Sequence, residues 1–157
     1  SNIYAFSIKD NLDIYSEHQK DGISFTIDKV HLTQQLKNHE SELTKEFSDN
    51  GIVLSGGEIQ KLAIARILDG EFGLILFDEP SSALDPIAEE QVMNLIYSMA
   101  STTTTIVIAH RLSSIRDMDC ILVVDNGRII EEGNHNQLMD KKGLYYQMWN
   151  IQAEKYK

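Results

Sequence analysis

Cysteine is nearly absent from this sequence, in which Cys120 is the only example. A single thiol cannot form a disulfide within the chain, and it cannot supply the several thiolates of a cysteine-based zinc site. Basic residues are also scarce, because 14 Lys and Arg stand against 24 Asp and Glu and give a formal charge of −10. A dedicated nucleic-acid-binding protein needs a cationic face, so we expect no nucleic-acid partner.

Long apolar runs are missing as well. The runs at 74–77 and 106–109 are far shorter than the roughly 20 residues that a membrane-spanning helix needs. Apolar residues nevertheless make up 42% of the 157 residues and charged residues 24%, which is close to the globular average. We therefore expect a folded, soluble domain, or the soluble part of a larger protein.

The first part of the chain favours helices. Helices are predicted over residues 7–15, 26–38 and 56–68. In the last of them apolar residues recur at helical spacing, and Ser55 is a good N-cap. The polar segment 16–22 predicts a loop.

Strands and helices alternate from about residue 70 onward. Apolar or β-branched runs predict strands at 74–77, 104–109 and 121–124, and Asn126-Gly127 predicts a tight turn into a strand at 128–131. Further helices are predicted at 86–100, with Asp85 as the cap, and at 134–140 and 143–154. The alternation indicates an α/β part with a parallel sheet at residues 70–157, after a helical subdomain at 1–69.

Two adjacent carboxylates, Asp78 and Glu79, follow the predicted strand at 74–77. Open α/β folds bind ligands at the carboxyl edge of the sheet. One of two such acids can hold a hard cation such as Mg²⁺, and the other can orient or deprotonate a water. The alternative interpretation is a solvated acidic turn.

Two glycines begin the predicted helix at 56–68, directly after Ser55. Gly56 and Gly57 leave backbone N–H groups accessible to an anion, which the helix dipole also attracts. Taken alone, this pattern is explained as well by an ordinary N-cap.

His110 follows the predicted strand at 104–109, so it could face the same sheet edge as Asp78 and Glu79. A histidine in this position is more often structural than catalytic. The remaining histidines lack such a setting and are expected on the surface: His18, His31, His39 and His135.

The order and spacing of these motifs together resemble the nucleotide-binding domain of an ABC transporter. Leu-Ser-Gly-Gly-Glu resembles the family signature, with Glu58 where Gln is commoner. The matching segments are the signature at 54–58, the Walker B strand at 74–78, the catalytic glutamate at Glu79, the D-loop at 81–85 and the switch histidine at His110.

The flanking segments resemble those of exporters within this family. Residues 4–12 resemble the segment after the Q-loop, Arg66 matches an arginine of the signature helix, and residues 132–138 and 143–149 resemble the C-terminal tail. From the residues alone, the aromatic and Met side chains of the tail form the buried stripe of an amphipathic helix: Tyr145, Tyr146, Met148 and Trp149.

The resemblance implies a partial P-loop NTPase (RecA-like) fold, with a parallel sheet core preceded by a helical subdomain. It also implies ATP hydrolysis coupled to transmembrane transport, by two such domains that face head to tail around ATP. The implied roles are nucleotide binding by Ser55, Gly56, Gly57 and Glu58, Mg²⁺ binding by Asp78, catalysis by Glu79 and His110, and coupling of the two sites by Ser82 and Asp85.

The P-loop pattern G-x-x-x-x-G-K-[ST] is absent, because none of the nine glycines precedes a Lys. We therefore expect that the chain begins part-way through the domain, and that its parent works at the cytoplasmic face of the membrane with a transmembrane domain. This chain alone is expected to be inactive and to self-associate through an exposed apolar core. Two alternatives remain, a soluble ABC ATPase and a non-enzymatic interaction module without a P-loop.

Overall fold

The computed structural model describes residues 4, 6–13, 22–36, 41–43, 51–68, 70–82 and 84–154. The chain divides into two compact units, Ser1–Ile106 and Val107–Lys157. Most of the predicted loop at 16–22, together with His18 and His39, lies outside the described residues.

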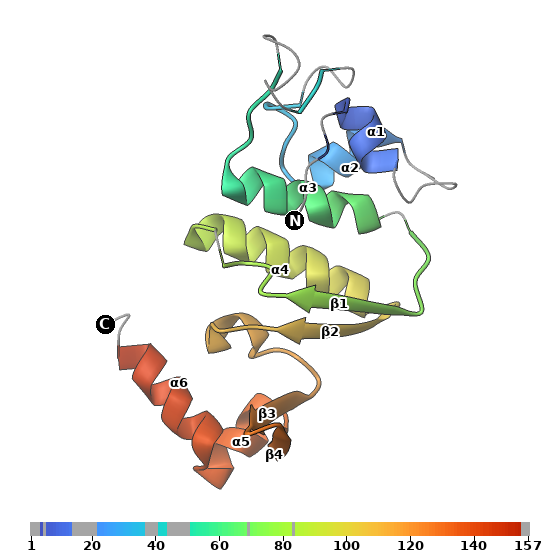
Figure 1. Cartoon of the computed structure of the whole chain (residues 1–157). Helices are drawn as coiled ribbons and strands as arrows, with labels where there is room; N and C mark the ends of the chain where they lie inside the picture. Colours follow the sequence, from blue (N-terminus) through green and yellow to red (C-terminus); the bar gives the residue numbers. More distant parts are fainter. Residues whose placement is uncertain are drawn as a thin grey trace. The chain divides into compact units, whose positions relative to one another are not determined.

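Three helices make up the first part of the first unit: α1 (Ile8–Leu12), α2 (Ile23–Lys29) and α3 (Gly56–Leu68) (Figure 1). Both α1 and α2 pack against α3. Their shared core is apolar and almost fully buried, and it includes Ile8, Leu12, Ile27, Leu32, Leu36, Leu62 and Ala65. The helix predicted at 56–68 is confirmed with the same bounds, whereas α1 is shorter than the predicted helix at 7–15.

The helix predicted at 26–38 is wrong in its bounds, because α2 begins at Ile23 and ends at Lys29. His31 has a φ of 55°, in the left-handed region that interrupts a helix. Beyond it the chain makes a single further helical turn, in which the N–H of Leu36 donates to the carbonyl of Leu32 at 3.0 Å. Both leucines reach the core, which explains why their spacing resembled that of a continuous helix.

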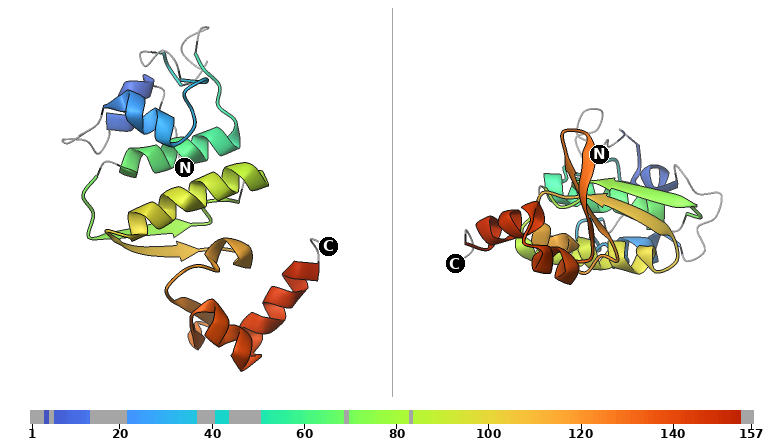
Figure 2. Two further views of the ribbon diagram at one scale, coloured as in Figure 1. Left: turned by 180° about the vertical axis from the view of Figure 1, so that it is seen from behind. Right: turned by 90° about the horizontal axis from the view of Figure 1, so that it is seen from below.

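A small parallel sheet completes the first unit and extends to the next. β1 (Leu74–Asp78) and β2 (Thr104–Ile108) are hydrogen-bonded neighbours that run in the same direction, with α4 (Pro86–Ala100) between them in sequence and alongside them in space (Figures 1 and 2). Asp85 caps α4, as expected, and Pro86 holds its first position. The predicted α/β architecture is therefore confirmed.

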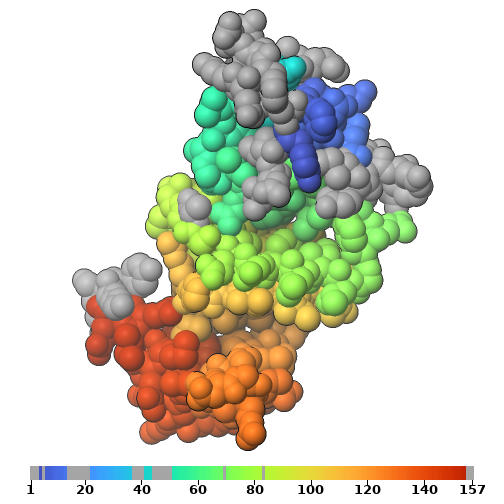
Figure 3. Space-filling model, viewed as in Figure 1, coloured from blue at the N-terminus to red at the C-terminus, as the bar shows by residue number. Residues whose placement is uncertain are grey.

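The sheet buries only one of its apolar faces. Ile75 and Phe77 of β1 are buried, whereas the alternate residues Leu74 and Leu76 are 55% and 62% exposed. On β2, Ile106 and Ile108 are exposed as well. Atoms of the two strands lie side by side at the surface in the view of Figure 3.

The second unit is built on a hairpin and two helices. β3 (Ile121–Asp125) pairs antiparallel with β4 (Arg128–Gly133), with a register shift between Val123 and Val124. The turn residues Asn126 and Gly127 have φ of 47° and 73°, the left-handed pair that a two-residue hairpin turn requires. A short 3-10 helix, η2 (Leu112–Ile115), precedes the hairpin, and α5 (His135–Lys141) and α6 (Leu144–Glu154) follow it.

The core of the second unit lies between the hairpin, η2 and the last two helices. Its buried residues are Leu112, Ile121, Val123, Leu138 and Tyr145. Of the stripe expected on α6, Tyr145 is buried and Tyr146 and Trp149 are partly buried. Met148 is 38% exposed, so its predicted burial is wrong.

His135 is partly buried, whereas a surface position was predicted. Its Nδ1 lies 2.9 Å from the Tyr145 hydroxyl, and its ring packs 4.4 Å from that of Trp149, centroid to centroid. Burial lowers the pKa of His135, as does the positive charge of Arg116, whereas Asp117 raises it. His31 is exposed, as predicted.

Candidate functional site

The start of α3 and the start of α4 line one hollow of about 350 Å³ in the first unit. Ser55, Gly56, Gly57 and Glu58 line it from α3, and Asp85 lines it from the cap of α4. The structure thus brings together the four residues for which the family resemblance implies nucleotide binding and one of the two residues for which it implies coupling of the sites. The first N–H groups of a helix have no acceptor within that helix, and two glycines hold these positions here.

Ser55 and Glu58 form a reciprocal cap at this end of α3. The N–H and the Oγ of Ser55 both donate to Glu58 Oε2 at 2.8 Å, and the N–H of Glu58 donates to Ser55 Oγ at 3.3 Å. Burial raises the pKa of Glu58, but hydrogen bonds from Ser55 and Gln35 and the charge of Lys61 lower it below its ordinary value. Glu58 is therefore an ionised carboxylate that accepts hydrogen bonds from Ser55.

Asp85 occupies the second side of the hollow as the cap of α4. Its Oδ1 accepts from the N–H groups of Ile87 and Ala88, each at 3.0 Å. The hydrogen bond from Ala88 is the main reason that the pKa of Asp85 lies below its ordinary value. Ser82, the other expected coupling residue, is exposed, and its N–H donates to the Glu79 carbonyl at 3.2 Å.

Asp78 and Glu79 lie where β1 ends. Asp78 is exposed, and Glu79 has a φ of 49°, a left-handed conformation that is uncommon for a residue with a side chain. Gln60 Nε2 of α3 donates to the Glu79 carbonyl at 3.0 Å. The helix that begins with the signature is thus tied directly to the backbone of the expected catalytic glutamate.

Gln60 and Asn11 hold α3 in place, and sequence reasoning missed both. Asn11 is fully buried, and its carboxamide bonds to backbone groups of residues 4, 6 and 7. Arg66 of α3 donates to the carbonyl and to Oδ1 of Asn11, at 2.8 and 2.7 Å. The match of Arg66 to the family pattern indicates that this arginine has a role in the helix. The sequence alone does not show that its partner is Asn11.

His110 belongs to the second unit, two residues after β2, and its side chain is exposed. Its carbonyl accepts a hydrogen bond from Gln152 Nε2 at 2.7 Å. The expected approach of His110 to Asp78 and Glu79 stays a prediction.

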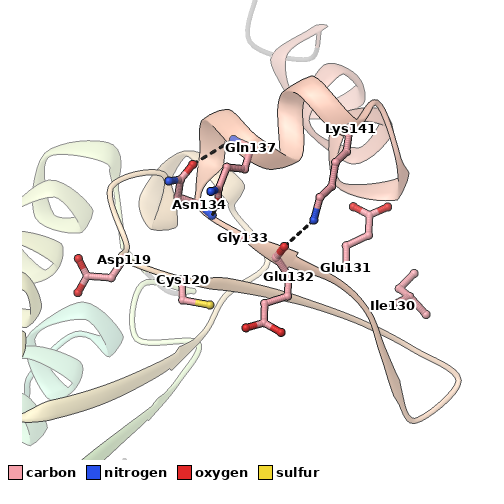
Figure 4. A pocket seen from close by; sticks show the side chains of 9 residues that line it. All are labelled: Asp119, Cys120, Ile130, Glu131, Glu132, Gly133, Asn134, Gln137 and Lys141. Atoms are coloured by element: carbon pink, nitrogen blue, oxygen red, sulfur yellow. Dashed lines mark hydrogen bonds between the residues drawn. The ribbon is translucent and has the colours of Figure 1, made fainter.

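A larger hollow, of about 770 Å³, lies in the second unit beside β4 and α5 (Figure 4). Its polar groups serve the fold: Lys141 Nζ donates to the Glu132 carbonyl at 2.7 Å, and Asn134 and Gln137 form the capping box of α5. Among the described residues no group of three or more His, Cys, Asp or Glu could hold a metal ion. This hollow is therefore a junction between elements and not a candidate site.

None of the helices in the described part of the chain is long and apolar enough to span a membrane. The chain matches no family model. It is 39% identical over 133 residues to an ATP-dependent lipid A-core flippase of Idiomarina loihiensis, and 49% identical over 108 residues to an ATM1-type heavy metal exporter of Novosphingobium aromaticivorans.

These alignments cover 85% and 69% of the chain but only 23% and 18% of the two proteins. A solved structure of a bacterial Atm1-family ABC exporter with ATP bound matches 98% of the chain and 27% of its own, with a TM-score of 0.82 and 35% identity. The same fold, the sequence identity and the motifs at α3 and β1 lead to one conclusion. The chain belongs to the ABC exporter family and corresponds to part of a nucleotide-binding domain.

Proposed function

We propose that this chain is part of a nucleotide-binding domain that hydrolyses ATP and couples the hydrolysis to transmembrane transport. The observation that carries the proposal is the hydrogen bond from Gln60 to the Glu79 carbonyl. This bond fixes the acidic turn after β1 to α3, which begins with Gly56 and Gly57 directly after its cap Ser55. A phosphate-binding helix start and a water-activating acid are thereby held in one folded unit.

The residues at the start of α3 suit a phosphate. Gly56 and Gly57 present backbone N–H groups at the positive end of the helix dipole. The hydroxyl of Ser55 lies beside them and donates to Glu58 in this structure. In the proposed assembly these groups contact the γ-phosphate of ATP held by a second nucleotide-binding domain, which faces the first head to tail. Glu58 belongs to the same nucleotide-facing surface, where its carboxylate controls the hydroxyl of Ser55.

Asp78 suits a hard cation, because it is an exposed carboxylate at the end of a strand. Mg²⁺ is commonly held by one or two carboxylates together with substrate phosphates, so a cluster of three acids is not required. When bound, Mg²⁺ would neutralise charge on the phosphates.

Glu79 polarises the attacking water as a general base, from a residue whose backbone is held in the left-handed conformation. His110 contacts the γ-phosphate. Ser82 and Asp85 couple the two ATP sites, and Asp85 is already part of the hollow at the signature. Phosphoryl transfer depends mainly on positioning and charge stabilisation, which these groups supply.

The complete transporter would add a transmembrane domain and place this domain at the cytoplasmic face of the membrane. Within the chain, we assign the signature to a helical subdomain at 1–69 and the acids to the C-terminal part of the ATPase core at 70–157. The chain alone lacks a P-loop pattern in its sequence, so we propose that it is inactive without one.

The substitution Glu79→Gln in the full-length transporter tests this function. The amide keeps the shape but loses the base, so ATP turnover should fall by about 10²- to 10⁴-fold while ATP binding is retained. Glu90→Gln removes one charge from an exposed position of α4 and is the matched control. ATPase activity of Glu79→Gln equal to that of the control would remove Glu79 from the proposed role.

A further inference from the structure

One side chain of α6 holds the backbone on both sides of Arg111, directly after His110. Gln152 Nε2 donates to the His110 carbonyl at 2.7 Å, and Gln152 Oε1 accepts from the Leu112 N–H at 2.9 Å. Both bonds lie within the second unit and join residues about 40 positions apart in sequence. A single carboxamide therefore fixes the carbonyl before Arg111 and the N–H after it.

The second of these bonds also starts η2. Leu112 is the first residue of η2, and the side chain of the N-cap residue Arg111 makes no capping hydrogen bond to this helix. Gln152 supplies the missing acceptor from another element. Leu112 is buried in the core of the unit. The bond to Gln152 therefore fixes the backbone two residues after the exposed residue His110.

Gln152 itself stands on a well-anchored helix. Tyr145, Trp149 and Gln152 are spaced by four and three residues, so they share one side of α6. Tyr145 is only 1% exposed and Trp149 packs against the same core. The carboxylate of Glu131 in β4 accepts from the N–H groups of Leu144 and Tyr145, which holds the start of α6.

We propose that Gln152 is a positioning residue for ATP hydrolysis, which acts by holding the backbone of His110 so that the imidazole meets the γ-phosphate in one orientation. The inference rests on the proposed function, in which His110 contacts that phosphate. A reacting group must be held within fractions of an ångström of its productive place, and a backbone fixed on both sides restricts the ring accordingly.

The test is the steady-state ATPase activity of the full-length transporter with Gln152→Ala. The turnover number should fall about tenfold while KM for ATP changes little, because misplacing a reacting group acts on the chemical step. Gln147→Ala is the matched control, since Gln147 is the same residue type on the same helix with an exposed side chain. Its activity should remain that of the unaltered protein.

A double-mutant cycle separates positioning from a merely structural effect. In a His110→Ala background, Gln152→Ala should change turnover by less than about twofold, because the residue through which it acts is already gone. Gln152→Glu, a variant that keeps an acceptor for Leu112 but offers the His110 carbonyl no donor, should lower turnover in the same way as Gln152→Ala. Because Gln152→Glu keeps the acceptor at the start of η2, a fall in its turnover cannot be attributed to loss of that cap.

The inference is overturned if Gln152→Ala is as active as Gln147→Ala, or if His110→Ala itself keeps normal turnover. It is also overturned if Gln152→Ala lowers turnover by the same factor in the His110→Ala background as in the unaltered protein. These outcomes differ from failure of the proposed function, which would appear as normal turnover of Glu79→Gln. Loss of activity in Glu79→Gln beside full activity in Gln152→Ala would reject the positioning role alone.

Discussion

Asn11 joins the first helix of the chain to the helix that begins with the signature. Its Nδ2 donates to the carbonyls of Tyr4, Phe6 and Ser7, and its Oδ1 accepts from the Tyr4 N–H and from Arg66. The Asn11 side chain is fully buried, so removing it deletes these bonds at a site that water does not reach. The carboxamide thus ties α1 to the backbone before it and, through Arg66, to α3.

We predict that Asn11→Ala destabilises the first unit by about 2–4 kcal/mol, because buried polar groups left without partners are costly, more so beside a charged guanidinium. Hydrogen exchange of the α3 amides measures this free energy. Asn94→Ala, at an exposed position of α4, is the control and should change it by no more than about 0.5 kcal/mol. Equal protection in the two variants would mean that the Asn11 network contributes nothing to α3.

At the scale of elements, the junction between β4 and α6 depends on one glycine. Glu131 reaches from β4 to the first N–H groups of α6, at Leu144 and Tyr145, and acts as the cap of that helix. A Cβ at Gly143 would overlap the carboxylate of Glu131. Gly143 therefore leaves the space that the cap occupies.

We predict that Gly143→Ala destabilises the second unit by about 1–2 kcal/mol, since the carboxylate must leave and α6 loses its cap. Trp149 is the only tryptophan, so its fluorescence during urea unfolding reports on this unit. Gly73→Ala is the control, because a Cβ there meets nothing within 4 Å. A midpoint for Gly143→Ala that coincides with the control would show that Glu131 is not needed as a cap.

Most element types could be predicted because local pattern and tertiary structure agree. The glycine pair and Ser55 predicted the start of α3, Asp85-Pro86 predicted α4, and Asn126-Gly127 predicted the hairpin turn, each through a local backbone preference. The end of α2 could not be predicted, because the left-handed residue there is His31 and not a glycine.

The site could be predicted as a set of residues but not as a set of contacts. Asp78, Glu79 and the signature are continuous motifs that resemble a family pattern. The bonds of Gln60 to Glu79 and of Gln152 to His110 join residues 19 and 42 positions apart, and no local spacing encodes such pairs. The environment of His135 is likewise set by Tyr145 and Trp149 of another helix.

On the scale of the whole molecule, the sheet of β1 and β2 leaves an apolar face open. Leu74, Leu76, Ile106 and Ile108 are about half exposed or more. Contiguous apolar surface of this kind is uncommon on soluble monomers, and open strand edges favour pairing. A formal charge of −10 opposes association only over a Debye length of about 8–10 Å at moderate salt.

We predict that the 157-residue chain self-associates through this face. Static light scattering should give a mass that rises with protein concentration, and Leu76→Lys should reduce that rise by placing a charge on the exposed face. Ile87→Lys, at an exposed apolar position of α4, should leave it unchanged. A strictly monomeric chain at crystallisation concentrations would contradict the prediction.

Amide hydrogen exchange tests whether the start of α3 binds a phosphate of ATP. In the full-length transporter carrying Glu79→Gln, so that bound ATP persists, Mg-ATP should slow the exchange of the Gly56 and Gly57 amides, because these N–H groups acquire phosphate acceptors. The amides of α6 near Gln147 should exchange as before. Unchanged exchange at Gly56 and Gly57 with ATP fully bound would mean that the start of α3 does not bind the phosphate.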